Sequence, residues 1–155
     1  GVADAAGCYE IQLKGGSYMN QHGGAGADKE LGTWNFGDSN NPVSFVSGSV
    51  EYPIFSTDEA EEWYVIQFCK GGGVILDNGA GKNITTSGID DVDTQKWKLV
   101  GDKDNCQFIN KKGNYLTYKS SYVQTATTAD SNGFKLVPTA NAKYPLQILM
   151  SARGI

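Results

Sequence analysis

The sequence predicts an all-β protein built from three copies of one four-stranded unit. The segment 95–100 begins with an amide and carries a bulky apolar residue two positions later, and it returns at 132–137 and more loosely at 41–46. Such a repeat is typical of one supersecondary unit used several times, whose copies must share a core. Glycine, at 20 of 155 residues, exceeds the usual ~7% and favours many tight turns. Apolar and polar residues mostly alternate at period two, and no stretch of about 11 residues has a convincing helical period.

Four strands are predicted in each unit, always in the same order. The first strand alternates apolar and polar residues, as in Tyr9-Glu10-Ile11-Gln12-Leu13, and a turn of lysine and glycine follows it. The second strand is short, the third follows a loop or turn, and the fourth is the recurring segment. First strands span 9–13, 64–68 and 107–110, second strands 18–20, 75–77 and 115–117, and third strands 31–34, 84–87 and 122–125. A ring of three such units removes most open sheet edges.

The units fit one domain over residues 1–155. They span 7–48, 63–101 and 105–138. Between units one and two, residues 56–62 form at most one capped turn. The segment 144–150 resembles the opening strand of unit one. It is either a strand that closes against the N-terminal region or the start of another copy in a longer natural chain.

Charge and hydropathy exclude several classes of partner. The net charge is −4 and the 13 basic residues are scattered. A nucleic-acid binder needs a concentrated positive face, which the sequence lacks, so we expect no nucleic-acid partner. No apolar run approaches the ~20 residues of a spanning helix, so we expect no membrane insertion.

The three cysteines, Cys8, Cys69 and Cys106, form an odd set without metal-ligand spacing. The sequence favours small, semi-buried thiols. A bridge between Cys8 and Cys106 is conceivable, but both precede first strands of different units. Another strand should hold them beyond the ~7 Å limit between the Cα atoms of a disulfide. We therefore expect no disulfide.

The amide and the bulky residue of the fourth strand carry a resemblance to a known family. Gln95-Lys96-Trp97, on the last strand of a threefold repeat, resembles the Gln-x-Trp motif of the ricin B-type β-trefoil, a lectin-like family. The resemblance implies a β-trefoil that acts as a non-catalytic carbohydrate-binding module, as part of a larger secreted or surface protein, in an extracytoplasmic setting. The same architecture hosts protease inhibitors and signalling ligands. A protein-interaction or structural trefoil with degenerate sugar pockets is therefore the alternative.

The resemblance also implies where a sugar binds. Each pocket of the family combines an acidic residue after the first hairpin, an aromatic platform on the third strand and an amide near the Gln-x-Trp. The apolar C–H face of a sugar packs on the ring, while its hydroxyls bind the carboxylate or amide. Carried over to unit one, these positions and a neighbouring loop hold Asn20, His22, Trp34, Asp38, Asn40 and Asn41.

Units two and three match this pattern less well. Unit two offers Asp77, Asn78 and Gln95, with Thr85 and Thr86 on its third strand and no ring. Unit three has Thr117 at the acidic position, with Tyr118 and Tyr122 nearby. Unit one is the best candidate, although Asn20 in place of the acid weakens hydroxyl recognition.

Two of these residues have alternative roles. Trp34 is either a sugar platform or a core residue, and the glycines around it favour partial exposure. His22 either stabilises its turn or touches a ligand. Trp97 lies on the repeated strand and is predicted to be core, and Trp63 is predicted to serve packing.

The sequence gives no support to catalysis, a metal site or a cofactor. His22 is the only histidine, so it cannot belong to a pair of histidine metal ligands. The acidic stretch 90–93 lacks the spacing of a calcium loop and is predicted to be a solvated turn. The glycine-rich stretch 23–27 lacks a phosphate-binding motif, so it serves a close backbone approach or a turn. We expect no catalytic residues.

Overall fold

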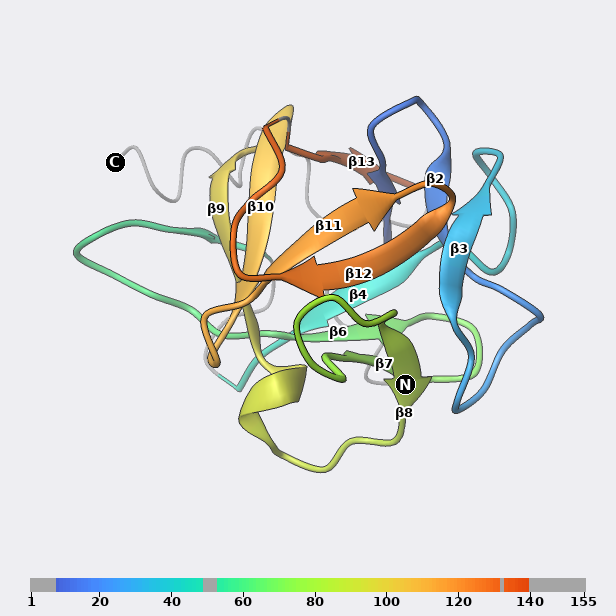
Figure 1. Ribbon diagram of the computed structural model, residues 1–155, viewed down its shortest axis with the longest axis horizontal. Coiled ribbons are helices and arrows are strands. Elements are labelled where there is room, and N and C mark those ends of the chain that lie inside the picture. Colours follow the sequence, from blue (N-terminus) through green and yellow to red (C-terminus); the bar gives the residue numbers. More distant parts are fainter. Residues whose placement is uncertain (1–7, 49–52, 132, 140–155) are drawn as a thin grey trace.

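The computed structural model describes residues 8–48, 53–131 and 133–139, and nearly all of its regular elements are strands (Figure 1). In chain order they are β1 (Tyr9–Gln12), β2 (Tyr18–Gln21), β3 (Leu31–Trp34), β4 (Val43–Val46), β5 (Phe55–Ser56), β6 (Val65–Phe68), β7 (Val74–Leu76), β8 (Thr85–Ser87), the 3-10 helix η2 (Asp93–Gln95), β9 (Trp97–Asp102), β10 (Asn105–Asn110), β11 (Tyr115–Lys119), β12 (Tyr122–Ala126) and β13 (Lys135–Pro138).

Six strands, the first and fourth of each unit, close into a barrel. β1 pairs with β4 and β13, β4 pairs with β6, and β9 pairs with β10, all antiparallel. Two backbone bridges complete the ring, Tyr64 with Trp97 and Cys106 with Phe134. Their N–H···O distances lie between 2.7 and 2.9 Å. Because the ring closes on itself, these strands have few unpaired backbone groups along their edges.

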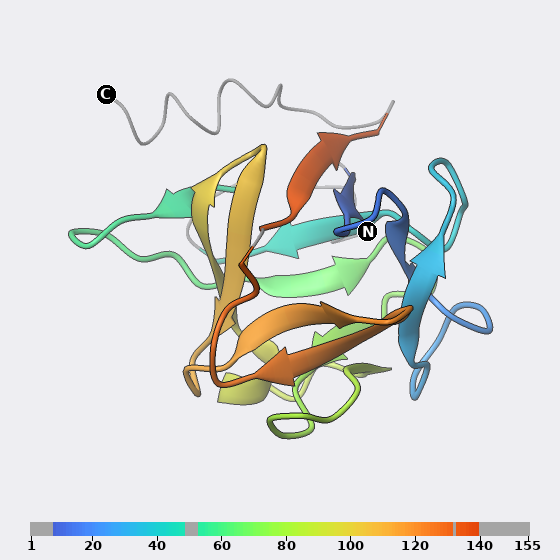
Figure 2. The same cartoon turned by 45° about the horizontal axis from the view of Figure 1, so that its top comes forward.

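The second and third strands of each unit form hairpins outside the barrel. These are β2–β3, β7–β8 and β11–β12. Figures 1 and 2 show them gathered beside one another, and bridges between Glu30 and Thr85 and between Asn83 and Gln124 join successive hairpins. The architecture is a β-trefoil, which confirms the fold class predicted from the sequence.

Each unit contributes side chains to one shared core from equivalent positions. The innermost residues of the three units are all fully buried. They are Ile11, Ile66 and Phe108 on the first strands and Met19, Ile75 and Leu116 on the second strands. On the third strands they are Leu31, Ile84 and Val123, and at the fourth strands they are Val43, Trp97 and Phe134. Burial of each large apolar side chain contributes about 2–3 kcal/mol. The prediction that Trp97 is core is confirmed.

The strand between units one and two was not predicted. β5 pairs parallel with β9, where Phe55 faces Leu99, and the Phe55 ring joins the core. The predicted capped turn follows directly, because the Thr57 hydroxyl accepts hydrogen bonds from the N–H groups of Glu59 and Ala60. The predicted strand 144–150 lies outside the described residues.

The prediction of no disulfide is wrong, because Cys8 and Cys69 are bonded with their Cα atoms 6.6 Å apart. The reason is the stagger of the barrel. Tyr9 and Phe68 both face Val43 of β4, so the start of β1 lies level with the end of β6. The next residues outward along those strands are the two cysteines. Cys106 is a buried free thiol, and burial raises its pKa, as does the charge of Asp102.

We expect the Cys8–Cys69 bond to stabilise the fold substantially. It closes a loop over a sequence separation of 61, for which chain entropy gives about 4 kcal/mol. Urea unfolding of the Cys8→Ser/Cys69→Ser variant should show a loss of that order, and Cys106→Ser provides the control that retains the bond. Equal midpoints for the wild type and the double variant would contradict this role.

Candidate functional site

The hairpin of unit one presents an aromatic surface to solvent. Tyr18 of β2 pairs directly with Trp34 of β3, so their side chains share one face of the hairpin. The Trp34 side chain is exposed (54%), as is Phe36 (56%), and the Phe36 ring packs edge-to-face on Tyr18 with 5.2 Å between centroids. We call Tyr18, Trp34 and Phe36 the aromatic patch. Of the two roles open to Trp34, the structure excludes the core residue.

Polar side chains lie next to the aromatic patch. The first is Asn20, which is two residues after Tyr18 on β2 and therefore on the same face of the hairpin. The Asn20 amide donates to Asp38 Oδ2 (3.0 Å) and to Asn41 Oδ1 (2.7 Å). Asp38 Oδ2 also accepts from the Asn40 N–H, which fixes the carboxylate. Among the described residues, Asn20 Oδ1 and Asp38 Oδ1 have no hydrogen-bond partner. Unit one therefore combines an exposed ring surface with two positioned acceptor oxygens.

Asn41 lies under this surface and holds the loop that carries it. Its amide donates to Glu10 Oε1 (2.8 Å) and to the Asn35 carbonyl (2.7 Å), and its side chain is fully buried. The second Glu10 oxygen accepts from the Gly37 N–H (2.9 Å). Asn41 thus orients Asn20 and the 35–41 loop, and its side-chain atoms are committed to protein partners.

Gln95 does the same for unit two. Its amide donates to Ser87 Oγ and to the Gly88 carbonyl (2.7 Å each), and its oxygen accepts from the Asp90 N–H. Gly88 is the counterpart of Asn35. The Asn41 and Gln95 amides therefore both donate a hydrogen bond to the carbonyl of the residue that follows the third strand of their unit. The loop continues into η2, a helical turn that was not predicted and that begins at the last residue of the stretch 90–93, predicted as a solvated turn.

Asp77 sits at the acidic position of unit two, but its carboxylate is turned into the protein. Oδ2 accepts from the amides of Asn110 and Asn114 (2.8 Å each), and Oδ1 accepts from Thr125 Oγ1 (2.6 Å) and the Gly79 N–H (2.8 Å). Burial tends to raise the pKa of this carboxyl, but the four hydrogen bonds outweigh it and lower the pKa. Asp77 therefore ties unit two to unit three.

The other predicted residues of units two and three do not assemble a second aromatic site. Asn78 is exposed but bonded to the Asn83 carbonyl and Thr85 Oγ1. The counterparts of Trp34 are Ser87 and Ala126, so neither unit has a ring at that place. In unit three the Thr117 hydroxyl donates to the Gln124 carbonyl, and Tyr118 packs against the core.

His22 is separated from the aromatic patch. It lines a small pocket of about 110 Å³ together with Gly32, Thr33, Ser121 and Tyr122. Neither Asn20 nor Trp34 contributes to that pocket. Sequence reasoning grouped His22 with Asn20 because they are two residues apart, and could not place the β11–β12 hairpin beside them.

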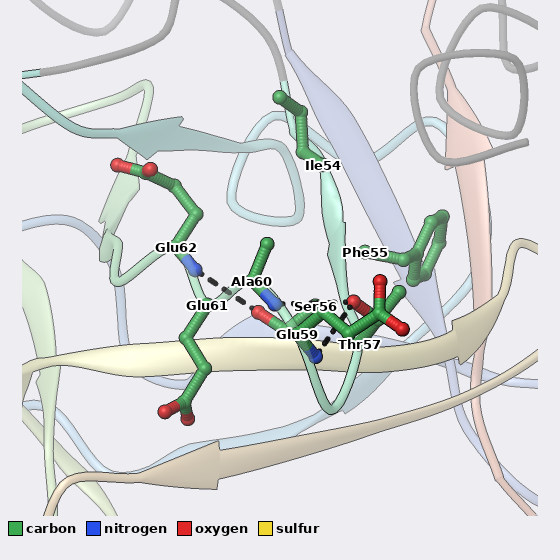
Figure 3. Close-up of a pocket in the computed structure, with 8 residues that line it drawn as sticks. All are labelled: Ile54, Phe55, Ser56, Thr57, Glu59, Ala60, Glu61 and Glu62. Atoms are coloured by element: carbon green, nitrogen blue, oxygen red, sulfur yellow. Dashed lines mark hydrogen bonds between the residues drawn. The ribbon is translucent and has the colours of Figure 1, made fainter. Parts of the chain in front are cut away.

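The linker between units one and two borders a larger pocket of about 350 Å³, lined by residues 54–57 and 59–62 (Figure 3). Figure 3 shows the side chains of Glu61 and Glu62 diverging from each other. Glu61 pairs with Lys98 at 2.6 Å, and Glu62 accepts a hydrogen bond from Ser47. These acidic groups are already engaged by the protein. Nearby, the ammonium groups of Lys98 and Lys111 lie over the Trp63 ring, 5.5 and 5.3 Å from its centroid, which supports a packing role for this ring.

Within 8–48, 53–131 and 133–139, no cluster of three His, Cys, Asp or Glu side chains has the geometry of a metal site. The described residues include no helix whose length and hydropathy suit a membrane crossing.

The fold places the chain in the class of β-trefoil proteins. The chain is similar to the designed threefold-symmetric protein ThreeFoil, with a TM-score of 0.65 and 13% identity over 85% of this chain and 99% of that one. It is similar to a Polyporus squamosus lectin solved with a sialylated epitope, with a TM-score of 0.64 and 16% identity over 85% of this chain and 49% of that one.

A third similar structure is SeviL bound to asialo-GM1 saccharide, with a TM-score of 0.62 and 21% identity over 86% of this chain and 98% of that one. The chain thus spans about half of the Polyporus lectin and nearly all of the other two. No protein-family model matches the sequence, and no curated protein matches it significantly. At these identities the likeness establishes the fold.

The Asp77 carboxyl should make the free energy of unfolding depend on pH. Because its folded pKa lies below the ordinary value of 3.8, its stabilisation is complete above that pH and is lost as the pH falls through the folded pKa. Asp77→Ala leaves the amides of Asn110 and Asn114 without this acceptor, which should cost about 3 kcal/mol at pH 7. Urea midpoints at pH 7 and pH 2.5 test this: the difference between wild type and variant should shrink at the lower pH, and a constant difference would contradict the assignment.

Proposed function

We propose that the protein is a non-catalytic carbohydrate-binding module whose sugar site is the surface of unit one, formed by the aromatic patch with Asn20 and Asp38. The observation that carries this proposal is the exposed Trp34 ring, which lies beside two acceptor oxygens, Asn20 Oδ1 and Asp38 Oδ1. No described residue donates a hydrogen bond to either oxygen. A hexose stacks its C–H face on the ring and donates two neighbouring hydroxyls to such oxygens.

The proposal refines the ricin B-like hypothesis. Asn41 and Gln95 support loops, and Asp77 joins units, so binding in this chain rests on one unit. Asp38, carried on the 35–41 loop, supplies the carboxylate that Asn20 lacks. A single shallow site with one stacked ring gives weak affinity, and avidity or attachment to other domains of a longer chain raises it.

An extracytoplasmic setting fits this function. The Cys8–Cys69 bond is of a kind that persists in oxidising compartments. The similar lectins are described with bound saccharides or saccharide epitopes, which supports a glycan partner for this chain as well. We propose a secreted or surface-exposed protein without a cofactor or catalytic residues.

We expect Trp34→Ala to lower the affinity of the unit-one surface at least tenfold for any glycan that the wild type retains on a glycan array. The loss follows from removal of the stacking surface, which contributes about 1.5 kcal/mol or more. Trp63→Ala is the matched control, because that ring lies outside the aromatic patch. Undiminished glycan binding by Trp34→Ala would remove the assignment.

The alternative is a protein-interaction trefoil with degenerate sugar pockets. The exposed acidic turn 57–61 favours it, since this insertion has no counterpart between units two and three. Glycan arrays and pull-downs from native extract separate the two functions. Absence of any glycan hit, with protein capture that is lost when Asp58 and Glu59 are replaced by serine, would support the alternative and overturn the sugar-binding proposal.

A further inference from the structure

The hairpins of the trefoil are joined by a contact that repeats around the threefold axis. At two of the three junctions, the loop between the second and third strands of one unit reaches a threonine on the third strand of the next. Thr86 of unit two donates its hydroxyl to the Gly26 carbonyl of unit one (2.7 Å). The Thr125 hydroxyl of unit three lies 2.8 Å from the Gly79 carbonyl of unit two and shares its single proton between this oxygen and Asp77 Oδ1. Both threonines are buried.

Backbone bonds reinforce both junctions. Asp28 N–H donates to the Thr86 carbonyl, and Gly81 N–H donates to the Thr125 carbonyl, each at 2.7 Å. The first junction is so close that a Cβ at Gly73 would lie 2.7 Å from the Gly26 carbonyl oxygen. The glycine-rich loop of unit one therefore serves close backbone approach.

The third junction lacks its loop. By the threefold relation, Leu31, Ile84 and Val123 are equivalent, so the counterpart of Thr86 and Thr125 is Thr33 of unit one. In unit three only Ser120 and Ser121 lie between β11 and β12, whereas unit one uses residues 22–30 and unit two residues 77–84. No described residue bonds the Thr33 hydroxyl, and the side chain is only partly buried.

The pocket of His22, Gly32, Thr33, Ser121 and Tyr122 occupies this place. The turn that borders it is strained, with φ of 46° at Ser120 and 79° at Ser121. In Figures 1 and 2 the tip of the β11–β12 hairpin reaches β3 in both views. His22 packs on Gly32, where an added Cβ would meet the His22 Cβ at 3.4 Å. The pocket is thus a gap left by a shortened loop.

We propose that this pocket is a second, non-equivalent ligand site for one edge of a monosaccharide ring. Its groups are neutral hydroxyls, an imidazole and the Tyr122 ring, whose side chain is 47% exposed. Hydroxyls of Thr33 and Ser121 both donate and accept, as vicinal diols require, and the Tyr122 ring offers a face for C–H groups. No carboxylate lines the pocket, so it has no feature that selects a cation. The volume of about 110 Å³ accommodates an edge of one ring.

The site is independent of the aromatic patch, so it can bind whether or not the proposed function of unit one holds. The experiment is a titration of the ¹⁵N-labelled protein with galactose, glucose, mannose and N-acetylglucosamine, followed by amide chemical shifts. We expect at least one of these sugars to shift Thr33, Ser121 and Tyr122 in the wild type and in Trp34→Ala.

Two variants locate the binding. Tyr122→Ala should weaken it about tenfold by removing the ring face. Thr33→Val should weaken it several-fold while keeping the side-chain volume, and both variants should leave any ligand-induced shift changes of Tyr18 and Phe36 unaltered. Shifts confined to the aromatic patch, Asn20 and Asp38 in the wild type, or no shift with any of the four sugars at 100 mM, would overturn the second site. Shifts of the pocket that persist in Tyr122→Ala and Thr33→Val with unchanged affinity would also overturn it.

Discussion

The shared interior of the barrel is the constraint on which the rest of the molecule depends. Each unit delivers one apolar side chain to every level of the core, such as Ile11, Ile66 and Phe108, and no unit can bury that face alone. The outward positions are free of this requirement. The place that holds Trp34 in unit one therefore holds Ser87 and Ala126 in the others, and a binding surface is present in one unit without cost to the fold.

Polar groups inside the trefoil add connections that apolar packing does not give. Asn110 occupies the position equivalent to Leu13 and Phe68, as the matching N–H bonds to Asn114, Ser17 and Gly73 show. A buried amide there needs a partner, and the carboxylate of Asp77 supplies it. The acidic residue that the resemblance assigned to a ligand is thus used to join two units, while the acid of unit one lies on a loop, at Asp38.

The sequence is informative where structure depends on local pattern. Predicted strands 9–13 and 122–125 correspond to β1 and β12 within a residue, because the alternation of apolar and polar residues at period two is visible in the chain. The exposure of Trp34 is suggested by its glycine neighbours. The Cys8–Cys69 bond, the partners of Asp77 and the pocket of His22 depend on residues brought together from different units. Thr125, for example, is 48 positions from Asp77, and no local pattern announces that contact.

The pairing of β1 with β13 has a consequence for the order in which a chain can connect the strands of this fold. Thr139 donates its hydroxyl to the Cys8 carbonyl at 2.7 Å, so the first and last described strands begin and finish side by side. The barrel therefore depends on which strands lie next to one another. It does not depend on which of the connecting loops is cut. A circularly permuted chain, cut at the solvent-exposed turn 57–60, can therefore form the same interior. The intact trefoil can also be inserted into a surface loop of a host protein, because its first and last described strands lie side by side.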